Sequence, residues 1–156
     1  MRAHAVWVAA GLAFGLGAGE AVACPDWEKA PSFGQINLDQ NFLPDPFRRN
    51  IRAGGQYDLS QCINGAHGWA AAAPDFDLYY HTNGSNTLTI TVQANTDTLL
   101  LINDPNGEWY FDDDSGGGDN PSISLEKAAD GLYDIWIGTY DRASGRAGTL
   151  LITELD

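Results

Sequence analysis

At 156 residues, the chain is long enough for one self-sufficient hydrophobic core and too short for two domains of ordinary size. Eight Lys and Arg residues stand against 21 Asp and Glu residues, and the formal net charge is -13. The excess is local, because no Lys or Arg lies between Arg52 and Lys127. Such a surface repels phosphate backbones and anionic membranes, so we expect no nucleic-acid partner and instead expect cations or partners with basic patches. The alternative is that the acidity only keeps the protein in solution.

The first 23 residues have the pattern of a signal peptide. A polar start that includes Arg2 is followed by an apolar run over residues 5–18 and then by Ala21-Val22-Ala23, a small-x-small cleavage pattern. The apolar run is too short and too rich in glycine for a membrane span. We therefore expect a mature chain with no transmembrane segment, located in the periplasm or secreted.

The two cysteines of the chain, Cys24 and Cys62, allow two interpretations. In an exported protein they most simply pair, and closing a loop of this length stabilises the fold by about 4 kcal/mol in the chain-entropy model. Alternatively, Cys24 would be the first mature residue and would carry a lipid anchor, although Ala21 stands where lipoprotein signals usually have Leu. Lipidation of Cys24 would exclude the disulfide.

Residues 24–52 are expected to form an irregular N-terminal arm, because four prolines interrupt them. Within the arm, only Gln35 to Leu38 alternates in a way that predicts pairing at a sheet edge. Arg48, Arg49 and Arg52 form the one basic cluster. They either dock an acidic partner or neutralise carboxylates of the protein itself.

After Gly55, short hydrophobic runs alternate with turn residues. The clearest strand covers residues 87–93, where apolar residues alternate with Thr and Gln. Residues 98–102 are apolar at nearly every position, which predicts a strand buried on both faces. Further strands are predicted at 56–61, 75–80, 108–112, 122–125, 132–140 and 149–155, with no convincing helix beyond a turn at 69–73. An all-β, antiparallel sandwich of about eight or nine strands follows.

Four stretches resemble the bacterial pre-peptidase C-terminal domain: PDFDLYY, NTLTITV, DTLLLINDPNGEWYFDDDSGGGDNPSISL and GLYDIWIGTYDRASGRAGTLLITEL. The resemblance implies a jelly-roll-like β-sandwich over residues 53–156, following the signal peptide (1–23) and the arm (24–52). It also implies a non-catalytic binding or accessory role, with calcium in some members.

The stretch from Asp97 to Asn120 predicts a β-hairpin with a loop rich in carboxylates and glycines. Carboxylate and amide oxygens are the ligands that calcium prefers. The predicted Ca²⁺ ligands are Asp104, Asn106, Asp112, Asp113, Asp114 and Asp119, with the first two adjacent to the others across the hairpin. The spacing matches neither an EF-hand loop nor the GGxGxD repeat, and the alternative is a solvated loop whose aspartates cap turn amides.

Two features of the sequence could indicate an enzyme. Asp-Ser-Gly-Gly at 114–117 resembles the surroundings of the nucleophile in chymotrypsin-like proteases, and His67 and Asp97 precede it in the order of a triad. Those enzymes need two barrels and more chain than this. Asp75 and Asp77 could in principle serve glycoside hydrolysis, but two positions on one strand offer little support for it. We therefore expect no enzyme.

Aromatic residues supply the alternative to an accessory module, which is a carbohydrate-binding module. The platform candidates are Trp109, Tyr110, Trp136 and Tyr140. Alternation places Trp136 beside Asp134 on one face, opposite Tyr133 and Ile135, so Trp136 is either displayed or covered by the N-terminal arm. The expected partner is an extracellular or periplasmic protein or polysaccharide.

Overall fold

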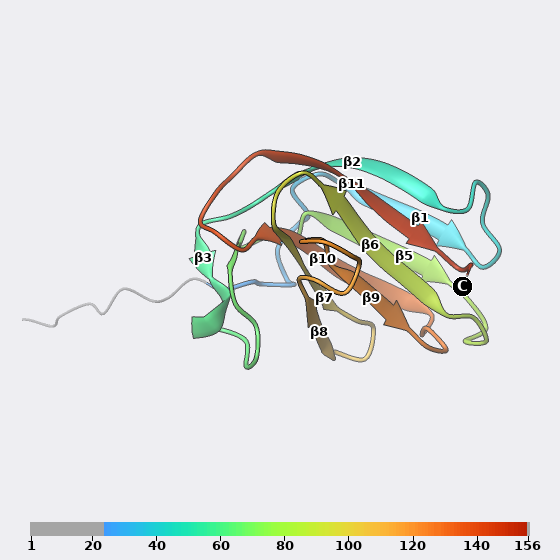
Figure 1. The fold of residues 1–156 in the computed structure, drawn as a ribbon. Helices are drawn as coiled ribbons and strands as arrows, with labels where there is room; N and C mark the ends of the chain where they lie inside the picture. Colours follow the sequence, from blue (N-terminus) through green and yellow to red (C-terminus); the bar gives the residue numbers. More distant parts are fainter. Residues whose placement is uncertain (1–23, 156) are drawn as a thin grey trace, which may run out of the picture.

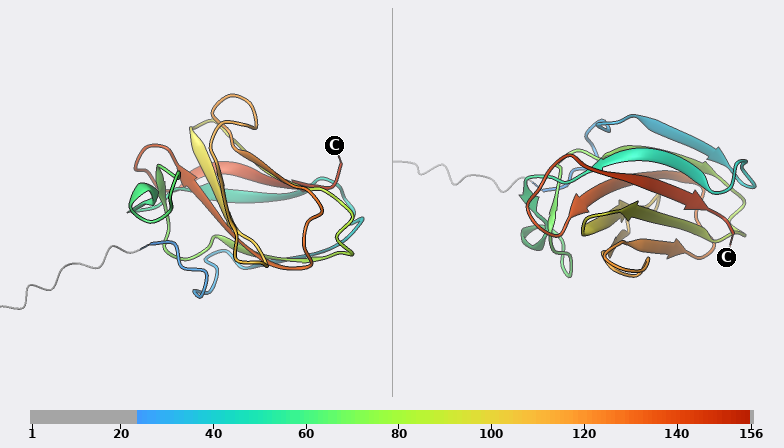
Figure 2. Two further views of the ribbon diagram at one scale, coloured as in Figure 1. Left: turned by 90° about the horizontal axis from the view of Figure 1, so that it is seen from below. Right: turned by 45° about the horizontal axis from the view of Figure 1, so that its top comes forward.

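The protein is a sandwich of two β-sheets in the computed structural model, which describes residues 24–155 (Figure 1). The predicted signal peptide, residues 1–23, lies outside the described residues. The smaller sheet contains, in order, β2 (Phe47–Ala53), β11 (Arg146–Thr153), β6 (Leu88–Ala94) and β9 (Ser122–Leu125). The right-hand view of Figure 2 shows these strands side by side.

The larger sheet is built around β10 (Gly131–Thr139). The first half of β10 pairs with β5, and its second half pairs with β7. The other members are β1 (Gln35–Asp39), β3 (Tyr57–Asp58), β4 (Trp69–Ala70), β5 (Phe76–His81), β7 (Thr98–Asn103) and β8 (Trp109–Asp112). All pairings are antiparallel except that of β1 with β5. The all-β sandwich predicted from the sequence is confirmed.

The main hydrophobic core fills the space between the two sheets, which the left-hand view of Figure 2 shows as two layers. Alternate residues of the longer strands point into it, including Ile90 of β6, Leu100 of β7 and Ile135 of β10. The outer face of the larger sheet carries a second core, in which Leu101 and Trp136 pack under Leu59. All six residues of β7 are buried, as predicted, because the strand contributes to both cores.

The N-terminal arm is more ordered than the sequence predicts. β1 lies at the edge of the larger sheet, where its alternation placed it. The expectation of an irregular segment is wrong for residues 47–53, because they form β2, the edge strand that pairs with β11 along its whole length. The sequence conceals β2 because only Ile51 and Ala53 of the strand are buried.

Two smaller expectations also change. Residues 56–61 form a two-residue strand, β3, followed by a 3-10 turn over Leu59–Gln61, and the expected turn at 69–73 begins with β4. Glycine makes this junction fit: a Cβ on Gly55 would lie 1.8 Å from the carbonyl carbon of Ala70. In the part of the chain that the structure describes, no helix is long and apolar enough to cross a membrane.

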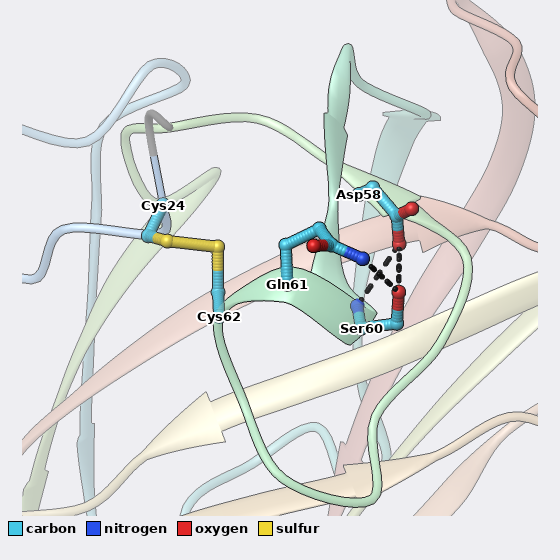
Figure 3. Close-up of a disulfide and its surroundings, with 5 residues drawn as sticks. All are labelled: Cys24, Asp58, Ser60, Gln61 and Cys62. Atoms are coloured by element: carbon cyan, nitrogen blue, oxygen red, sulfur yellow. Dashed lines mark hydrogen bonds between the residues drawn. A yellow bond between two sulfur atoms is a disulfide. The ribbon is translucent and has the colours of Figure 1, made fainter. Parts of the chain in front are cut away.

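A disulfide joins Cys24 to Cys62, with 5.6 Å between their Cα atoms. Figure 3 shows it beside the 3-10 turn, whose start is capped by Asp58: its carboxylate accepts hydrogen bonds from the Ser60 backbone N–H and hydroxyl. The bond holds the beginning of the arm against the body of the domain. The backbone N–H of Asp26, which donates to the Ala72 carbonyl, continues this attachment.

Candidate functional site

The six predicted calcium ligands do not form one site. β7 and β8 pair so that Asn103 faces Trp109 at one end of the hairpin, while Leu100 faces Asp112 at the other. Asp104 and Asn106 therefore lie in the turn, and Asp112 lies at the opposite end of β8, before the loop with Asp113, Asp114 and Asp119. The expected adjacency across the hairpin is wrong, because a strand pair separates the two groups along its length.

The carboxylate oxygens of Asp104 and Asp112 already accept hydrogen bonds from the protein. The Asp104 carboxylate accepts from the backbone N–H groups of Asn106 and Glu108. The Asp112 carboxylate accepts from the backbone N–H groups of Ser115 and Ser122. These are the turn-capping roles that the alternative interpretation gave to the aspartates. Over residues 24–155, no group of three or more His, Cys, Asp or Glu side chains is arranged to hold a metal ion.

The residues of the protease-like order do not assemble either. The Ser115 hydroxyl donates to Asp112, at 2.5 Å, instead of to a histidine. His67 is hydrogen-bonded to Asp113, with 2.6 Å between Nε2 and Oδ2, and its ring packs edge-on against Phe111. Without a contact between Ser115 and His67, the Asp-Ser-Gly-Gly stretch is a structured acidic loop rather than a triad.

The four predicted platform aromatics lie in different environments. Trp136 is fully buried in the outer core, so it is covered, mainly by the segment around Leu59 instead of by the arm. Tyr110 packs on the main core, and the half-exposed Tyr140 contacts the ring of His67. Trp109 lines a pocket: its ring centroid lies 5.4 Å from that of Trp136, and 36% of the residue is exposed. Tyr110 lines a smaller hollow.

Trp109 belongs to a pocket of about 500 Å³ on the outer face of the larger sheet, which we call the outer pocket. Its lining comprises Trp27 from the arm, Asn103 of β7, the turn at 104–107, and Leu132 and Asp134 of β10. Its volume is within the range of small-molecule sites. Another hollow, of about 610 Å³, is lined by small and amide residues such as Gly116 and Gln93 and holds neither an aromatic nor a carboxylate. A third hollow, of about 350 Å³, is lined by Tyr110, Tyr133, Asp104, Glu126 and Lys127 but by no indole. The outer pocket combines two indoles with the buried carboxyl of Asp134.

The floor of the outer pocket is set by strand register. Asp134 of β10 faces Asp77 of β5 on one side and Asn103 of β7 on the other, and Asn103 in turn faces Trp109 of β8. Because directly paired residues project from the same face of a sheet, these four side chains form a row across four strands. The row ends at the pocket's aromatic wall.

Asp77 and Asp134 form a buried carboxyl pair, which we call the acid pair. Their exposed fractions are 7% and 4%, and the two side chains lie within hydrogen-bonding reach of each other. Burial, followed by the charge and hydrogen bond of Asp77, raises the pKa of Asp134 to about 7; burial also raises the pKa of Asp77. Two like charges this close do not both ionise readily, so the pair retains a proton near neutral pH.

Two residues of this site were missed as functional residues in the sequence. Trp27 was assigned only to an irregular arm, and its place depends on the disulfide and the contact of the arm with Ala72. Asp134 was noted only as the neighbour of Trp136 on one face. The available signal was a carboxyl on the half-buried face of a strand that is otherwise hydrophobic, GLYDIWIGT.

A scan against protein-family models finds no match to this chain, and a search of curated proteins finds none either.

Proposed function

We propose that this protein is an exported, non-catalytic binding module that takes its ligand in the outer pocket. The observation that carries the proposal is the pairing of two partly exposed indoles, Trp27 and Trp109, with a buried acid at the floor of one pocket. Aromatic walls supply contact area, and a few fixed polar groups orient a ligand. The resemblance to pre-peptidase C-terminal domains supports the same class of function.

The spacing of the acid pair favours binding over glycoside hydrolysis. Retaining enzymes hold their two carboxyls about 5–5.5 Å apart, and inverting enzymes hold them farther apart to admit a water molecule. Asp77 and Asp134 are instead within hydrogen-bonding reach of each other. The pair therefore matches a fixed recognition group better than an acid and nucleophile on either side of a sugar bond.

Export to the periplasm or beyond is supported by the Cys24–Cys62 disulfide, because such bonds persist in oxidising compartments. In that setting the ligand belongs to an extracellular or periplasmic protein or polysaccharide. Carbohydrate is the first class to test, since indoles such as Trp109 provide flat apolar faces on which sugar rings stack.

The test is a pull-down on insoluble polysaccharides combined with tryptophan fluorescence titration of soluble oligosaccharides. Trp109→Ala and Trp27→Ala should each weaken binding at least tenfold. Tyr140→Ala is the matched control, because Tyr140 is half exposed and contacts His67 away from the pocket. A ligand whose affinity is unchanged in both Trp variants would contradict the location of the site.

Calcium stabilisation is a second proposal. The cation would be attracted by the summed charge of the acidic rim of Asp97, Asp113, Asp114, Asp119 and Asp141, because no preformed set of three carboxylates is present over residues 24–155. Burial, and then the negative charge of the other four, raise the pKa of Asp97. One buried oxygen of Asp97, Oδ1, has no hydrogen-bond partner. A cation at this rim would relieve the repulsion.

The expected result is a rise in Tm on adding calcium, measured by thermal melting. The rise should be absent in the Asp114→Asn/Asp119→Asn double variant and retained in Asp39→Asn, which alters an exposed carboxylate on β1. An equal response in both variants would show that calcium acts elsewhere.

A further inference from the structure

The acid pair lacks a basic partner in the protein. No ion pair over residues 24–155 includes Asp77 or Asp134, and the one Lys–carboxylate pair joins Lys29 to Asp26 on the surface. The Oδ1 atom of Asp77 is buried without any hydrogen-bond partner. Asp77 does not line the outer pocket, so a ligand in the pocket meets Asp134, which is 4% exposed and has no cationic partner in the described residues. A buried carboxylate without such a partner is costly, and a cationic ligand in the pocket would supply one.

The surroundings of the pair add negative charge. The Asp104 side chain lies in the wall of the same pocket. The chain neighbours of its two indoles are also charged: Glu108 is next to Trp109, and Asp26, Glu28 and Lys29 lie within two residues of Trp27. Asp104 also borders a second hollow, which holds Glu126 and Lys127. The field in the pocket therefore repels an anionic ligand and favours a cation.

Resting on the proposed function, we propose that the outer pocket recognises a protonated amine, whose N–H groups donate to Asp134 and whose charge lies between the indoles of Trp27 and Trp109. Indole faces attract a cation through the ring quadrupole, and this attraction strengthens when the cation is desolvated. Asp134 lines the pocket at 4% exposure, so a bound ammonium would be shielded from water. Asp77, which is paired with Asp134 on the neighbouring strand β5, holds the Asp134 side chain in position.

The proton balance of binding follows from the acid pair. Near neutral pH the pair retains a proton, consistent with the raised pKa of both carboxyls. An ammonium group that donates to the pair replaces this proton as its source of positive charge, and the proton leaves to solvent. The O–H bond of the protonated carboxyl is the one bond that breaks. Binding should therefore release protons and weaken as the pH falls through the pKa of Asp134, about 7.

A protonated amine can come from an amino sugar or from a lysine side chain. The probes are a glucosamine hexamer, the N-acetylglucosamine hexamer of the same length, and a short peptide with a single lysine. The two sugars differ only in the charge and acetylation of the nitrogen, so their comparison isolates the cation. The peptide separates the two sources.

The experiment is isothermal titration calorimetry at pH 7 in two buffers of different ionisation enthalpy. We expect the glucosamine hexamer or the lysine peptide to bind at least tenfold more tightly than the acetylated hexamer, with net proton release. Asp134→Asn should lower that preference at least tenfold and reduce the proton release. If Asp134→Asn unfolds below the temperature of the titration, Asp77→Asn is used in its place. Asp39→Asn, on the exposed side of β1, should change neither quantity.

The outcomes separate this inference from the proposed function. Equal affinity for the two hexamers, lost in Trp109→Ala, would overturn amine recognition while supporting a binding module that stacks neutral sugars. Absence of binding by all three probes would also overturn it, and the polysaccharide panel would then decide the proposed function independently. Tight binding of the glucosamine hexamer that persists in Asp134→Asn, Asp77→Asn and Trp109→Ala would show only general attraction to the acidic surface.

Discussion

At the scale of single residues, the unusual feature is the burial of three carboxyls on or beside the central strands of the larger sheet. Asp134 lines the outer pocket and is paired with Asp77 on the neighbouring strand, whereas Asp75 accepts a hydrogen bond from the backbone N–H of Ile137 at 2.6 Å. Burial raises the pKa of Asp75 to about 7, and the hydrogen bond from Ile137 opposes this rise. Ionisation of these buried carboxyls therefore lowers the free energy of unfolding.

We predict that Asp75→Asn stabilises the protein at pH 8 and flattens its pH dependence. A carboxyl whose pKa is raised on folding keeps a proton that the unfolded chain has released. Its contribution is complete below the unfolded value of 3.8 and is lost as the pH rises through about 7. Asn retains an acceptor for Ile137 and cannot ionise, so the free energy of unfolding should increase by about 2 kcal/mol at pH 8.

The measurement is urea unfolding between pH 4 and pH 8. The difference between Asp75→Asn and the parent should shrink towards pH 4, because that pH is close to the unfolded pKa of 3.8 and the unfolded chain then binds more of the proton that the folded protein keeps. Asp39→Asn serves as control, since Asp39 is exposed on β1. A constant difference at all pH values would indicate altered packing instead of titration.

At the scale of elements, β7 explains how a thin sandwich accommodates so many apolar residues. Leu100 faces the main core between the sheets, and Leu101 faces the outer core under Leu59. Each side chain is fully buried. The larger sheet is thus covered on both faces at β7 and β10, while β6 keeps one face partly exposed.

We predict that Leu100→Ala and Leu101→Ala each lower the free energy of unfolding by about 2–5 kcal/mol, because each deletes methyl groups from a packed core. The control is Gln93→Ala on the exposed face of β6, which should cost less than about 0.5 kcal/mol. Denaturant melts of the three variants give the comparison. A small cost for Leu101→Ala alone would show that the outer core is loosely packed.

At the scale of the whole molecule, the disulfide holds in place the segment that supplies one wall of the outer pocket. Cys24 ties the start of the arm to Cys62, and Trp27 follows three residues later at the pocket's rim. The acid pair is supplied by the sheet, whereas one aromatic wall is supplied by the arm. Ligand binding and arm attachment should therefore be coupled.

We predict that Cys24→Ser/Cys62→Ser costs about 2–4 kcal/mol of stability, because the oxidised unfolded chain is restricted by a closed loop. The same variant should bind pocket ligands more weakly even at temperatures where it remains folded. Intact-mass analysis of the mature parent before and after reduction checks the premise, since a lipid on Cys24 would add mass and exclude the bond. Unchanged affinity in the double Ser variant would show that Trp27 is held by other contacts.

The sequence by itself determined the sandwich, because period-two alternation in β6 and β10 and the continuous apolar run of β7 leave few ways to bury those side chains. It left two roles open for Cys24, a disulfide with Cys62 or a lipid anchor, and the structure joins the two cysteines. It did not reveal β2, because the polar composition of residues 47–53 is typical of a loop. The strand can be recognised only from its pairing with β11. The predicted adjacency of Asp104 and Asp112 was wrong, because the register of β7 and β8 places them at opposite ends of one hairpin.

Only the tertiary structure decided the candidate site. Asp77 and Asp134 are far apart in the chain, and they meet because β5 and β10 pair in one particular register. Trp27 joins them through a disulfide to a distant turn. Local patterns specify which face of a strand a residue occupies, but register and long-range attachment determine which residues share that face.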